Sequence, residues 1–309
     1  MKQTFEVPAQ EGGKKYYEDK GYPEVYVETK MTDQDKDGYS FKVDVISIER
    51  DTQLEINDIL QALGFYGEAC KYTEDLTKVE IGPFTKTRLR CMDITEEIVV
   101  KEGTREICSP NVDPRRVEIL DLPSTLTEIG PWCCYNLGSL TTVRFHNNQT
   151  INIRENAFCL NTGLKEIIGL DPKYINCIEE GAFAGCASLT VVPIPNNHTV
   201  TTIPKRYAAE TACKIITIPT YIKHVEYYAF GSCHHLEAVY IMEGCERVER
   251  QAFSHCESLT IVKIPDSVKK IYEDTFEGCG MFTVVCNPGS YAEYWANMMK
   301  IHVEHSGTL

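Results

Sequence analysis

Three aspartates followed by a glycine are the residues whose spacing most directly suggests chemistry. Asp33, Asp35 and Asp37 alternate with other residues and precede Gly38, as at the start of a calcium-binding loop, where alternate carboxylates converge on the ion. The twelfth position of such a loop is normally a bidentate glutamate, whereas here it is Asp44. The flanking residues also alternate as strands do. Because Asp-Gly is a common hairpin turn, the sequence favours a polar turn over a calcium site.

A second set of candidates combines cysteine with histidine. Cys233-His234-His235 and His255-Cys256 lie about one repeat apart, which would bring thiols and imidazoles together. Zinc sites, however, draw their ligands from short spacings such as C-x-x-C, and this spacing is absent here. His234 and His255 occupy positions that vary between repeats, as exposed positions do. We therefore predict neither a metal nor a cofactor.

Motifs of common catalytic machinery are missing from the sequence. It contains no G-x-S-x-G elbow, no phosphate-binding loop and no H-E-x-x-H pair, which position nucleophiles, phosphates and zinc in major enzyme classes. The remaining acidic pairs are typical of solvated surfaces. We therefore expect a protein that is not an enzyme.

Composition and charge narrow the choice of partners. The 309 residues are 43% hydrophobic and 25% charged, as in ordinary globular proteins, and carry a formal net charge of −14. An acidic chain suits neither nucleic acid nor an anionic membrane, since both need clustered lysine and arginine. No segment approaches the roughly 18 apolar residues of a membrane helix. The start, Met1 to Pro8, lacks a signal-peptide core, so the chain as given is expected to be cytosolic or to have lost its signal.

The elements that carry these residues follow a repeat, which is clearest from Val248 to Pro265. Counted from Val248, small or apolar residues fall at +4, +5, +8, +11, +14 and +16. The same spacing starts at Ile129, Ile153, Ile178, Val225 and Ile271, with a looser copy, one residue short, from Ile203. Start-to-start distances of 22 to 25 residues are typical of a solenoid. The Leu-x-x-Val-x-Ile segment predicts a short strand whose alternate residues face inward.

Many of the fourteen cysteines belong to this repeat. The +8 position holds a cysteine or another side chain of modest size, namely Leu137, Asn161, Cys186, Cys233, Cys256 or Cys279. We interpret it as a packing position whose side chain satisfies backbone groups at the turn before the strand. Buried free thiols are therefore favoured over disulfides. The redox state stays open for Cys70, Cys91 and Cys108.

Residues 1–75 lack the repeat and predict a small α+β domain. Alternation of apolar and polar residues indicates one strand near Val25–Val27 and another from Tyr39 to Val45, with Asp44 among the polar positions. Thr52 and Glu55 then form a capping box that starts a helix with an apolar face. Two strands alone are marginally stable, so hairpin and helix are expected to pack together.

The solenoid is expected to occupy residues 76–309 and to be capped at both ends. Residues 76–122 contain short strand-like pieces and a repeat head whose turn is replaced by Ser109–Pro114, which predicts an atypical first cap. The C-terminal cap, residues 287–309, begins where Asn287–Ser290 breaks the repeat. Within it, Tyr291–Met299 predicts a short amphipathic helix that covers the last coil, and Ile301–Val303 a final strand.

The consensus Ile-x-x-x-Ala-Phe-x-x-Cys-x-x-Leu-x-x-Val-x-Ile-Pro resembles the BspA-type leucine-rich repeat family. The segment Pro288–Ala296 is similar to the one that often closes such arrays. The resemblance covers about residues 98–303 and leaves out residues 1–75. It implies a curved α/β solenoid with a parallel sheet on its concave face, found in surface or secreted proteins of bacteria and some protists. It also implies binding and adhesion to host or matrix proteins.

In such a sheet, the residues beside the inward +14 position project from the surface. Those just before it are Thr142, Glu166, Val191, Ile215, Ala238, Ile261 and Val284, and those just after it are Arg144, Ile168, Pro193, Thr217, Tyr240, Lys263 and Cys286. One column turns from polar to apolar along the array, as partner surfaces often do, although β-branched residues also suit strands for their own sake. We predict that a partner contacts ten of them: Arg144, Glu166, Ile168, Val191, Ile215, Thr217, Ala238, Tyr240, Ile261 and Lys263.

Two functions fit these observations. In the first, a non-enzymatic solenoid binds a protein or glycan, and the N-terminal domain adds contacts or an anchor; replacing Tyr240, Ile261 and Lys263 together should abolish capture without unfolding. In the second, a cytosolic effector or enzyme-associated protein carries an activity in its N-terminal domain, and the repeats select the target. Folding and calcium or small-ligand binding by the first 75 residues alone would favour the second. A purely structural role is a third option, and the partner and oligomeric state stay open.

Overall fold

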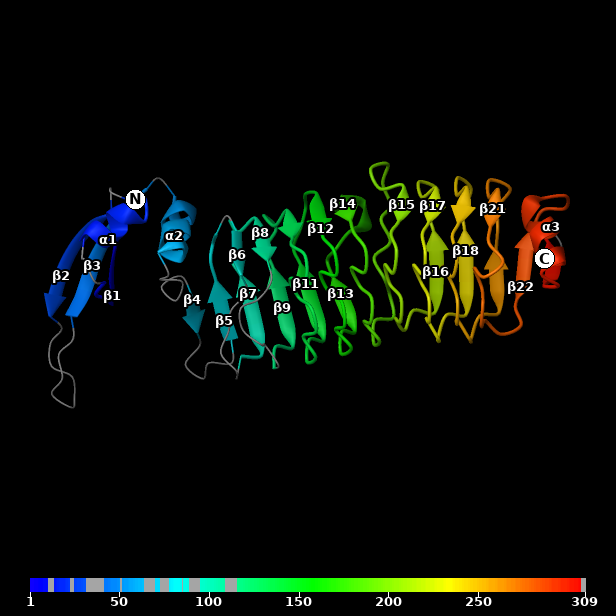
Figure 1. Cartoon of the computed structure of the whole chain (residues 1–309), viewed down its shortest axis with the longest axis horizontal. Helices are drawn as coiled ribbons and strands as arrows, with labels where there is room; N and C mark the ends of the chain where they lie inside the picture. Colours follow the sequence, from blue (N-terminus) through cyan, green and yellow to red (C-terminus); the bar gives the residue numbers. More distant parts are fainter. Residues whose placement is uncertain are drawn as a thin grey trace.

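The chain forms an elongated row of coils with a small domain at its N-terminal end (Figure 1). This computed structural model describes residues 1–10, 14–22, 25–31, 42–50, 52–63, 70–72, 78–84, 86–88, 95–108 and 116–306. Within them, the buried apolar residues gather into two clusters, one from Val7 to Leu63 and the other from Ile81 to Ala296. The domain boundary near residue 75 stays a prediction.

The N-terminal domain is an antiparallel sheet of three strands with two helices. Its strand order is β1-β3-β2, so the strand expected in the second half of the hairpin lies in the centre. The predicted strands and the capped helix are present, whereas β1 and α1 are additional elements. Their bounds are β1 (Lys2–Pro8), α1 (Lys14–Asp19), β2 (Tyr26–Met31), β3 (Lys42–Glu49) and α2 (Gln53–Ala62).

Asp44 does not follow the alternation of apolar and polar residues that was predicted for β3. It is completely buried, on the same side of the strand as Ile46 and Ile48, rather than on a polar face. The carboxylate accepts hydrogen bonds from the Gln10 N–H at 2.9 Å, the Tyr17 hydroxyl at 3.1 Å and the Thr29 hydroxyl at 2.7 Å. These bonds offset the cost of burying it. Burial and the bond to Asp44 raise the pKa of Tyr17.

Helix α2 links the N-terminal domain to the array. It begins with the predicted capping box, in which the Thr52 hydroxyl accepts from the Glu55 N–H at 3.3 Å and the Glu55 carboxylate accepts from the Thr52 N–H at 2.9 Å. Two side chains then donate to backbone carbonyl groups of the first coil, Asn57 to that of Pro83 at 2.8 Å and Gln61 to that of Lys86 at 2.6 Å. The helix is thereby shared between both parts. Its buried apolar residues are Ile56, Ile59 and Leu60.

The array is a solenoid in which the coils contribute two rows of parallel strands, and the strands of one row are mostly longer than those of the other (Figure 1). The coil that contains Thr190–Ile194 contributes no strand to the row of mostly longer strands. The longer strands are β5 (Lys78–Ile81), β7 (Glu97–Val100), β9 (Ile119–Leu122), β11 (Thr142–Phe145), β13 (Glu166–Ile168), β16 (Ile215–Ile218), β18 (Ala238–Ile241), β20 (Ile261–Lys263) and β22 (Thr283–Cys286). The shorter ones are β6 (Lys86–Arg88), β8 (Glu106–Cys108), β10 (Glu128–Ile129), β12 (Ile151–Ile153), β14 (Ile175–Ile178), β15 (Thr202–Ile203), β17 (His224–Val225), β19 (Arg247–Val248) and β21 (Lys270–Ile271). The predicted parallel solenoid is confirmed.

Stacked aromatic rings fill the centre of the array. The +5 residues of successive coils face one another: the Phe230 and Phe253 ring centroids are 5.4 Å apart, as are those of Phe253 and Phe276. In the coil that is one residue short, Tyr207 takes this place and lies 5.7 Å from Phe183. Such pairs contribute on the order of 1 kcal/mol beyond the burial of their area. The aromatic column therefore fixes the register between coils.

The +8 position satisfies backbone groups, as predicted. The thiols of Cys186, Cys233 and Cys256 are buried, and each donates to a backbone carbonyl of the preceding coil at 3.1 Å, 3.3 Å and 3.4 Å, respectively. Asn161 does the same through its amide group, at 2.7 Å from the Cys134 carbonyl oxygen. A buried carbonyl without a donor is costly, and the thiol or amide at these four positions avoids that cost.

Both ends of the array have extra elements. At the N-terminal end, β5, β7 and β9 already pair in parallel, so regular coils begin inside the predicted cap, and β4 (Cys70–Tyr72) adds an antiparallel edge. At the other end, the predicted helix α3 (Tyr291–Met298) buries Trp295 against the last coil, and the predicted final strand β23 (His302–His305) pairs with β22.

Candidate partner-binding face

The long-strand face is the surface formed by the outward side chains of the row of mostly longer strands and of the segment Thr190–Ile194. The strands of this row are β5, β7, β9, β11, β13, β16, β18, β20 and β22. Nine of the ten predicted contact residues are exposed or half-buried on it: Arg144, Glu166, Ile168, Val191, Ile215, Thr217, Tyr240, Ile261 and Lys263. Ala238 is the exception, with 6% of its surface exposed. It pairs in register with Ile215 on one side and Ile261 on the other, and these longer side chains cover it. Ala238 is therefore corrected to a packing residue.

Four further positions that were expected to project are buried as well. In the last coil, Val284 pairs with the inward Val262, one residue earlier than the +14 count, so Val284 and Cys286 are completely buried. Pro193 is also buried. Thr142 is only 9% exposed, and its hydroxyl donates to the Glu166 carboxylate at 3.2 Å.

The sheet of this face is interrupted in the middle of the array. Strands β13 and β16 are not neighbours in one sheet, and the residues between them, Thr190–Ile194, form no strand. Among the described residues, no backbone hydrogen bond joins the N–H groups of Val191 or Val192 to an adjacent coil. Pro193 and Pro195 lack N–H groups altogether, and proline is excluded from the interior of a sheet for this reason. The Val-Pro-Ile-Pro sequence is the signal from which the interruption could have been predicted.

Two grooves flank the interrupted segment. One, of about 830 Å³, lies toward β13 and is lined by residues that include Glu166, Ile168 and Val191. The other, of about 500 Å³, lies toward β16 and is lined by residues that include Val191 and Ile215. Val191 thus separates two hollows in an otherwise regular surface.

Three large aliphatic side chains stand beside these grooves, and we call Ile168, Val191 and Ile215 the apolar cluster. Their exposed fractions are 45%, 75% and 59%. Isolated apolar residues on a surface need no explanation, but neighbouring ones around a hollow are typical of binding sites. The sequence prediction named all three residues, but not the grooves between them.

Charges of both signs surround the apolar cluster. Lys165, Glu118 and Glu166 line the first groove and Lys214 lines the second. Some charges are paired between coils: the Lys214 ammonium lies 3.5 Å from the Glu237 carboxylate, and the Arg144 guanidinium 3.6 Å from that of Glu97. Such exposed pairs contribute little to stability. The surface around the apolar cluster therefore carries charges of both signs.

The other sequence candidates lie elsewhere. His234 and His255 are exposed, and His234 lies 3.6 Å from the Glu257 carboxylate, while Cys233 and Cys256 are inside the array. Asp33, Asp35 and Asp37 fall outside the described residues. Across the part of the chain that is described, no group of three or more His, Cys, Asp or Glu residues is arranged to hold a metal ion.

The twelve cysteines from Cys108 to Cys286 are free thiols. Burial raises the pKa of Cys186 to about 12 and that of Cys245 to about 11. A thiol reacts as its thiolate, so these two are poor nucleophiles and poor metal ligands near neutral pH. Their role is to fill the core.

No helix in the described part of the chain is both long and apolar enough to cross a bilayer.

Comparison with known proteins follows the repeat. Residues 95–199 and 168–283 match the BspA type Leucine rich repeat region, in six copies. No curated protein sequence matches the chain.

The chain is also similar to solved bacterial structures. A leucine rich cell surface protein from Faecalibacterium prausnitzii A2-165 has 18% identity and a TM-score of 0.37, over 77% of this chain and 93% of that chain. The leucine rich repeat protein of T. pallidum has 16% identity and a TM-score of 0.40, over 76% and 94% of the two chains. One from Eubacterium ventriosum has 18% identity and a TM-score of 0.41, over 71% and 70%. Likeness at this level concerns the fold alone. The repeat match, in contrast, spans more than half of the chain, and the protein therefore belongs to the BspA type leucine-rich repeat family.

Proposed function

We propose that this chain is a non-enzymatic binding protein that captures a protein partner on its long-strand face. The observation that carries the proposal is the apolar cluster, in which Ile168, Val191 and Ile215 stand exposed beside two grooves. Proteins of this repeat family typically bind other proteins and are generally not enzymes. In the proposed complex the cluster is the buried centre of the contact.

Burial of this centre contributes a measurable part of the binding free energy. Covering three half-exposed aliphatic side chains is worth about 1 kcal/mol each, or about 3 kcal/mol in total. This corresponds to roughly a hundredfold in Kd. The grooves beside Val191 receive partner side chains, and the Val191 N–H group, which makes no backbone hydrogen bond to an adjacent coil, donates to a partner carbonyl group.

A protein suits this surface better than a glycan does. The cluster is aliphatic, whereas sugar rings are usually held by stacking on aromatic side chains. Tyr240 is the aromatic residue among the predicted contacts, and it is half-buried. The net charge of −14 also makes nucleic acid a poor partner.

Adhesion is the finer form of this proposal. The family resemblance implies attachment to host or matrix proteins at a cell surface, and a row of coils offers a long surface for such contacts. In this form the remaining predicted residues, including Thr217 and Lys263, extend the contact from the apolar cluster toward the C-terminal coils.

The test compares capture by matched surface variants. Purified extracellular-matrix proteins are immobilised, and binding of the intact chain is followed by biolayer interferometry. The first variant replaces the apolar cluster (Ile168→Ser, Val191→Ser and Ile215→Ser). The control removes three large hydrophobic side chains outside the cluster, which are 37%, 44% and 43% exposed (Tyr135→Ser, Tyr227→Ser and Met242→Ser). A third variant replaces Tyr240, Ile261 and Lys263 with serine.

For any matrix protein that the unmodified chain binds, we expect the cluster variant to have a roughly hundredfold higher Kd. The control variant should keep the Kd of the unmodified chain. Weakening in the third variant would extend the contact along the array. Circular dichroism should show the same fold in all variants. Equal affinity of the cluster variant and the unmodified chain would contradict the proposal.

A further inference from the structure

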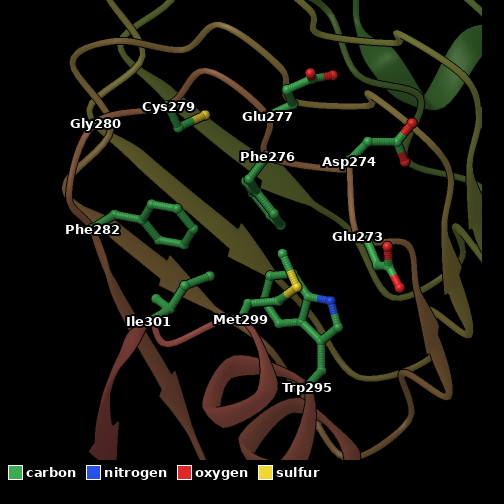
Figure 2. Close-up of a pocket in the computed structure, with 10 residues that line it drawn as sticks. All are labelled: Glu273, Asp274, Phe276, Glu277, Cys279, Gly280, Phe282, Trp295, Met299 and Ile301. Atoms are coloured by element: carbon green, nitrogen blue, oxygen red, sulfur yellow. The ribbon is translucent and has the colours of Figure 1, made fainter.

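A third hollow lies at the C-terminal end of the array, away from the long-strand grooves. It measures about 440 Å³ and is formed between the last coil and the cap, with Phe276 and Phe282 on one side and Trp295 and Met299 on the other (Figure 2). This size is within the range of small-molecule sites. The proposed partner contact does not use these residues.

The floor of this pocket is aromatic. The Phe276 ring centroid lies 5.1 Å from that of Phe282 and 5.7 Å from that of Trp295. The faces of such rings carry partial negative charge and attract cations. Met299 and Ile301 complete the apolar lining. The floor thus suits an apolar body with a positive charge close to it.

The rim of the pocket is acidic. Glu273, Asp274 and Glu277 line it, and no lysine, arginine or histidine does so among the described residues. Arg250 approaches Asp274 from outside, at 3.4 Å, and Gln251 donates to Glu277 at 3.2 Å. Among the described residues, Arg250 is the one cation in an ion pair with these three carboxylates, which leaves the rim with an excess of negative charge.

Two polar atoms inside the pocket wall have no partner. Trp295 is only 5% exposed, and its indole N–H donates to no acceptor; one oxygen of the Asp274 carboxylate is buried and accepts no hydrogen bond. In Figure 2 the indole nitrogen lies on the side of the ring toward Glu273. Buried polar groups without partners are rare and costly. Such groups beside a cavity are typical of a binding site.

We propose that this pocket binds a small organic cation, that is, an ammonium group on an aromatic or aliphatic body. The body lies on Phe276, Phe282 and Trp295, and the ammonium group donates to Asp274 and Glu273 at the rim. The indole N–H of Trp295 then donates to a polar atom of the ligand or to an ordered water.

The test uses the buried indole as its reporter. The chain has two tryptophans, so Trp132→Phe leaves Trp295 as the single indole. Its fluorescence is excited at a wavelength at which tyrosine and the probes do not absorb. Three probes of nearly equal shape are titrated at constant ionic strength and neutral pH: 2-phenylethylammonium, neutral 2-phenylethanol and anionic 3-phenylpropanoate. Ligand-detected NMR of the same probes reports binding independently of fluorescence.

Paired variants separate this rim from charge in general. Glu273→Gln with Glu277→Gln removes two rim charges. The control, Glu180→Gln with Glu210→Gln, removes two exposed charges from other coils, and Glu180 occupies the same position of its repeat as Glu273.

We expect saturable binding of 2-phenylethylammonium with a Kd on the order of millimolar, as befits so small a probe. The rim variant should bind it with an about fivefold higher Kd. The control variant should bind it with the same Kd as the parent. Binding of the alcohol or the anion as tightly as the amine would overturn the proposal, as would equal affinity of rim and control variants. The absence of saturable binding in both fluorescence and NMR would also overturn it.

Discussion

Asn161 offers the sharpest test of how the coils are held together. Its side chain is completely buried and makes three hydrogen bonds: it accepts from the Leu137 N–H at 2.8 Å and donates to the Cys134 and Phe158 carbonyl oxygens at 2.7 Å each. The Phe158 oxygen also accepts from the Cys186 thiol at 3.1 Å. The substitution Asn161→Ala therefore leaves two buried groups without a partner, the Leu137 N–H and the Cys134 carbonyl.

The expected loss follows from these two groups. Each orphaned buried group costs on the order of 1 to 3 kcal/mol, so Asn161→Ala should lower the free energy of unfolding by about 3 kcal/mol. Asn161→Cys should recover at least about half of this, because a thiol at this position donates to the preceding coil elsewhere in the array, as Cys186 does. The cysteine sulfur also accepts weakly from a backbone N–H of that coil, as Cys186 does from Asn161.

Urea denaturation followed by circular dichroism measures the loss, and hydrogen exchange of the Leu137 amide locates it. Asn176→Ala is the matched control, since Asn176 is exposed and its side chain donates to the Asn152 side-chain oxygen at 3.0 Å. It should change the free energy of unfolding by less than about 0.5 kcal/mol. If Asn161→Ala were as mild as this control, or if Asn161→Cys were as damaging as the alanine variant, the account of the +8 position would be refuted.

Further predictions concern glycine, helix capping and pH. Gly169 has φ +78°, and a Cβ there would lie 2.0 Å from the Phe145 carbonyl oxygen, whereas nothing lies within 4 Å of one at Gly138. Gly169→Ala should therefore cost at least about 2 kcal/mol in urea denaturation, with Gly138→Ala much milder. Thr52→Ala should destabilise α2 by about 1 kcal/mol, measured by hydrogen exchange; unchanged exchange would contradict the capping account. Burial raises the pKa of Cys186 from 9.0 to about 12, so its contribution to stability is present below pH 9.0 and is lost as the pH rises through about 12. The urea midpoint of Cys186→Ala should thus fall less steeply than that of the parent over this range, and parallel curves would refute the assignment.

Elements defined by local spacing could be predicted from the sequence. The capping box of Thr52 and Glu55 and the helix around Trp295 depend on residues within one or two turns of each other. The inward columns, such as that of Cys186, were predictable because the same spacing recurs in every coil. Because this spacing recurs along the chain, it predicted the solenoid, and the structure confirms that fold.

Features that depend on distant neighbours could not be predicted in the same way. Asp44 is buried because three donors from other elements converge on it, and its own strand pattern does not reveal them. Ala238 is covered only because both of its neighbours in the sheet are isoleucines. Val284, rather than the residue that the +14 count gives, pairs with the inward Val262, because the last coil is one residue shorter than that count assumes.

The candidate site shows the same division. The exposure of Ile168, Val191 and Ile215 follows from their positions beside an inward column. The grooves between them arise because Pro193 interrupts the sheet, and their size depends on how the two flanking coils settle around that segment.

The most direct test of the binding account is site-specific photo-cross-linking of the intact chain to a captured matrix protein. A benzophenone side chain replaces Val191, which is 75% exposed in the centre of the apolar cluster, or Tyr227, which is 44% exposed outside it. We expect a cross-linked product from position 191 and little from position 227. Efficient cross-linking from position 227 with none from position 191 would contradict the central claim that the partner binds over the apolar cluster.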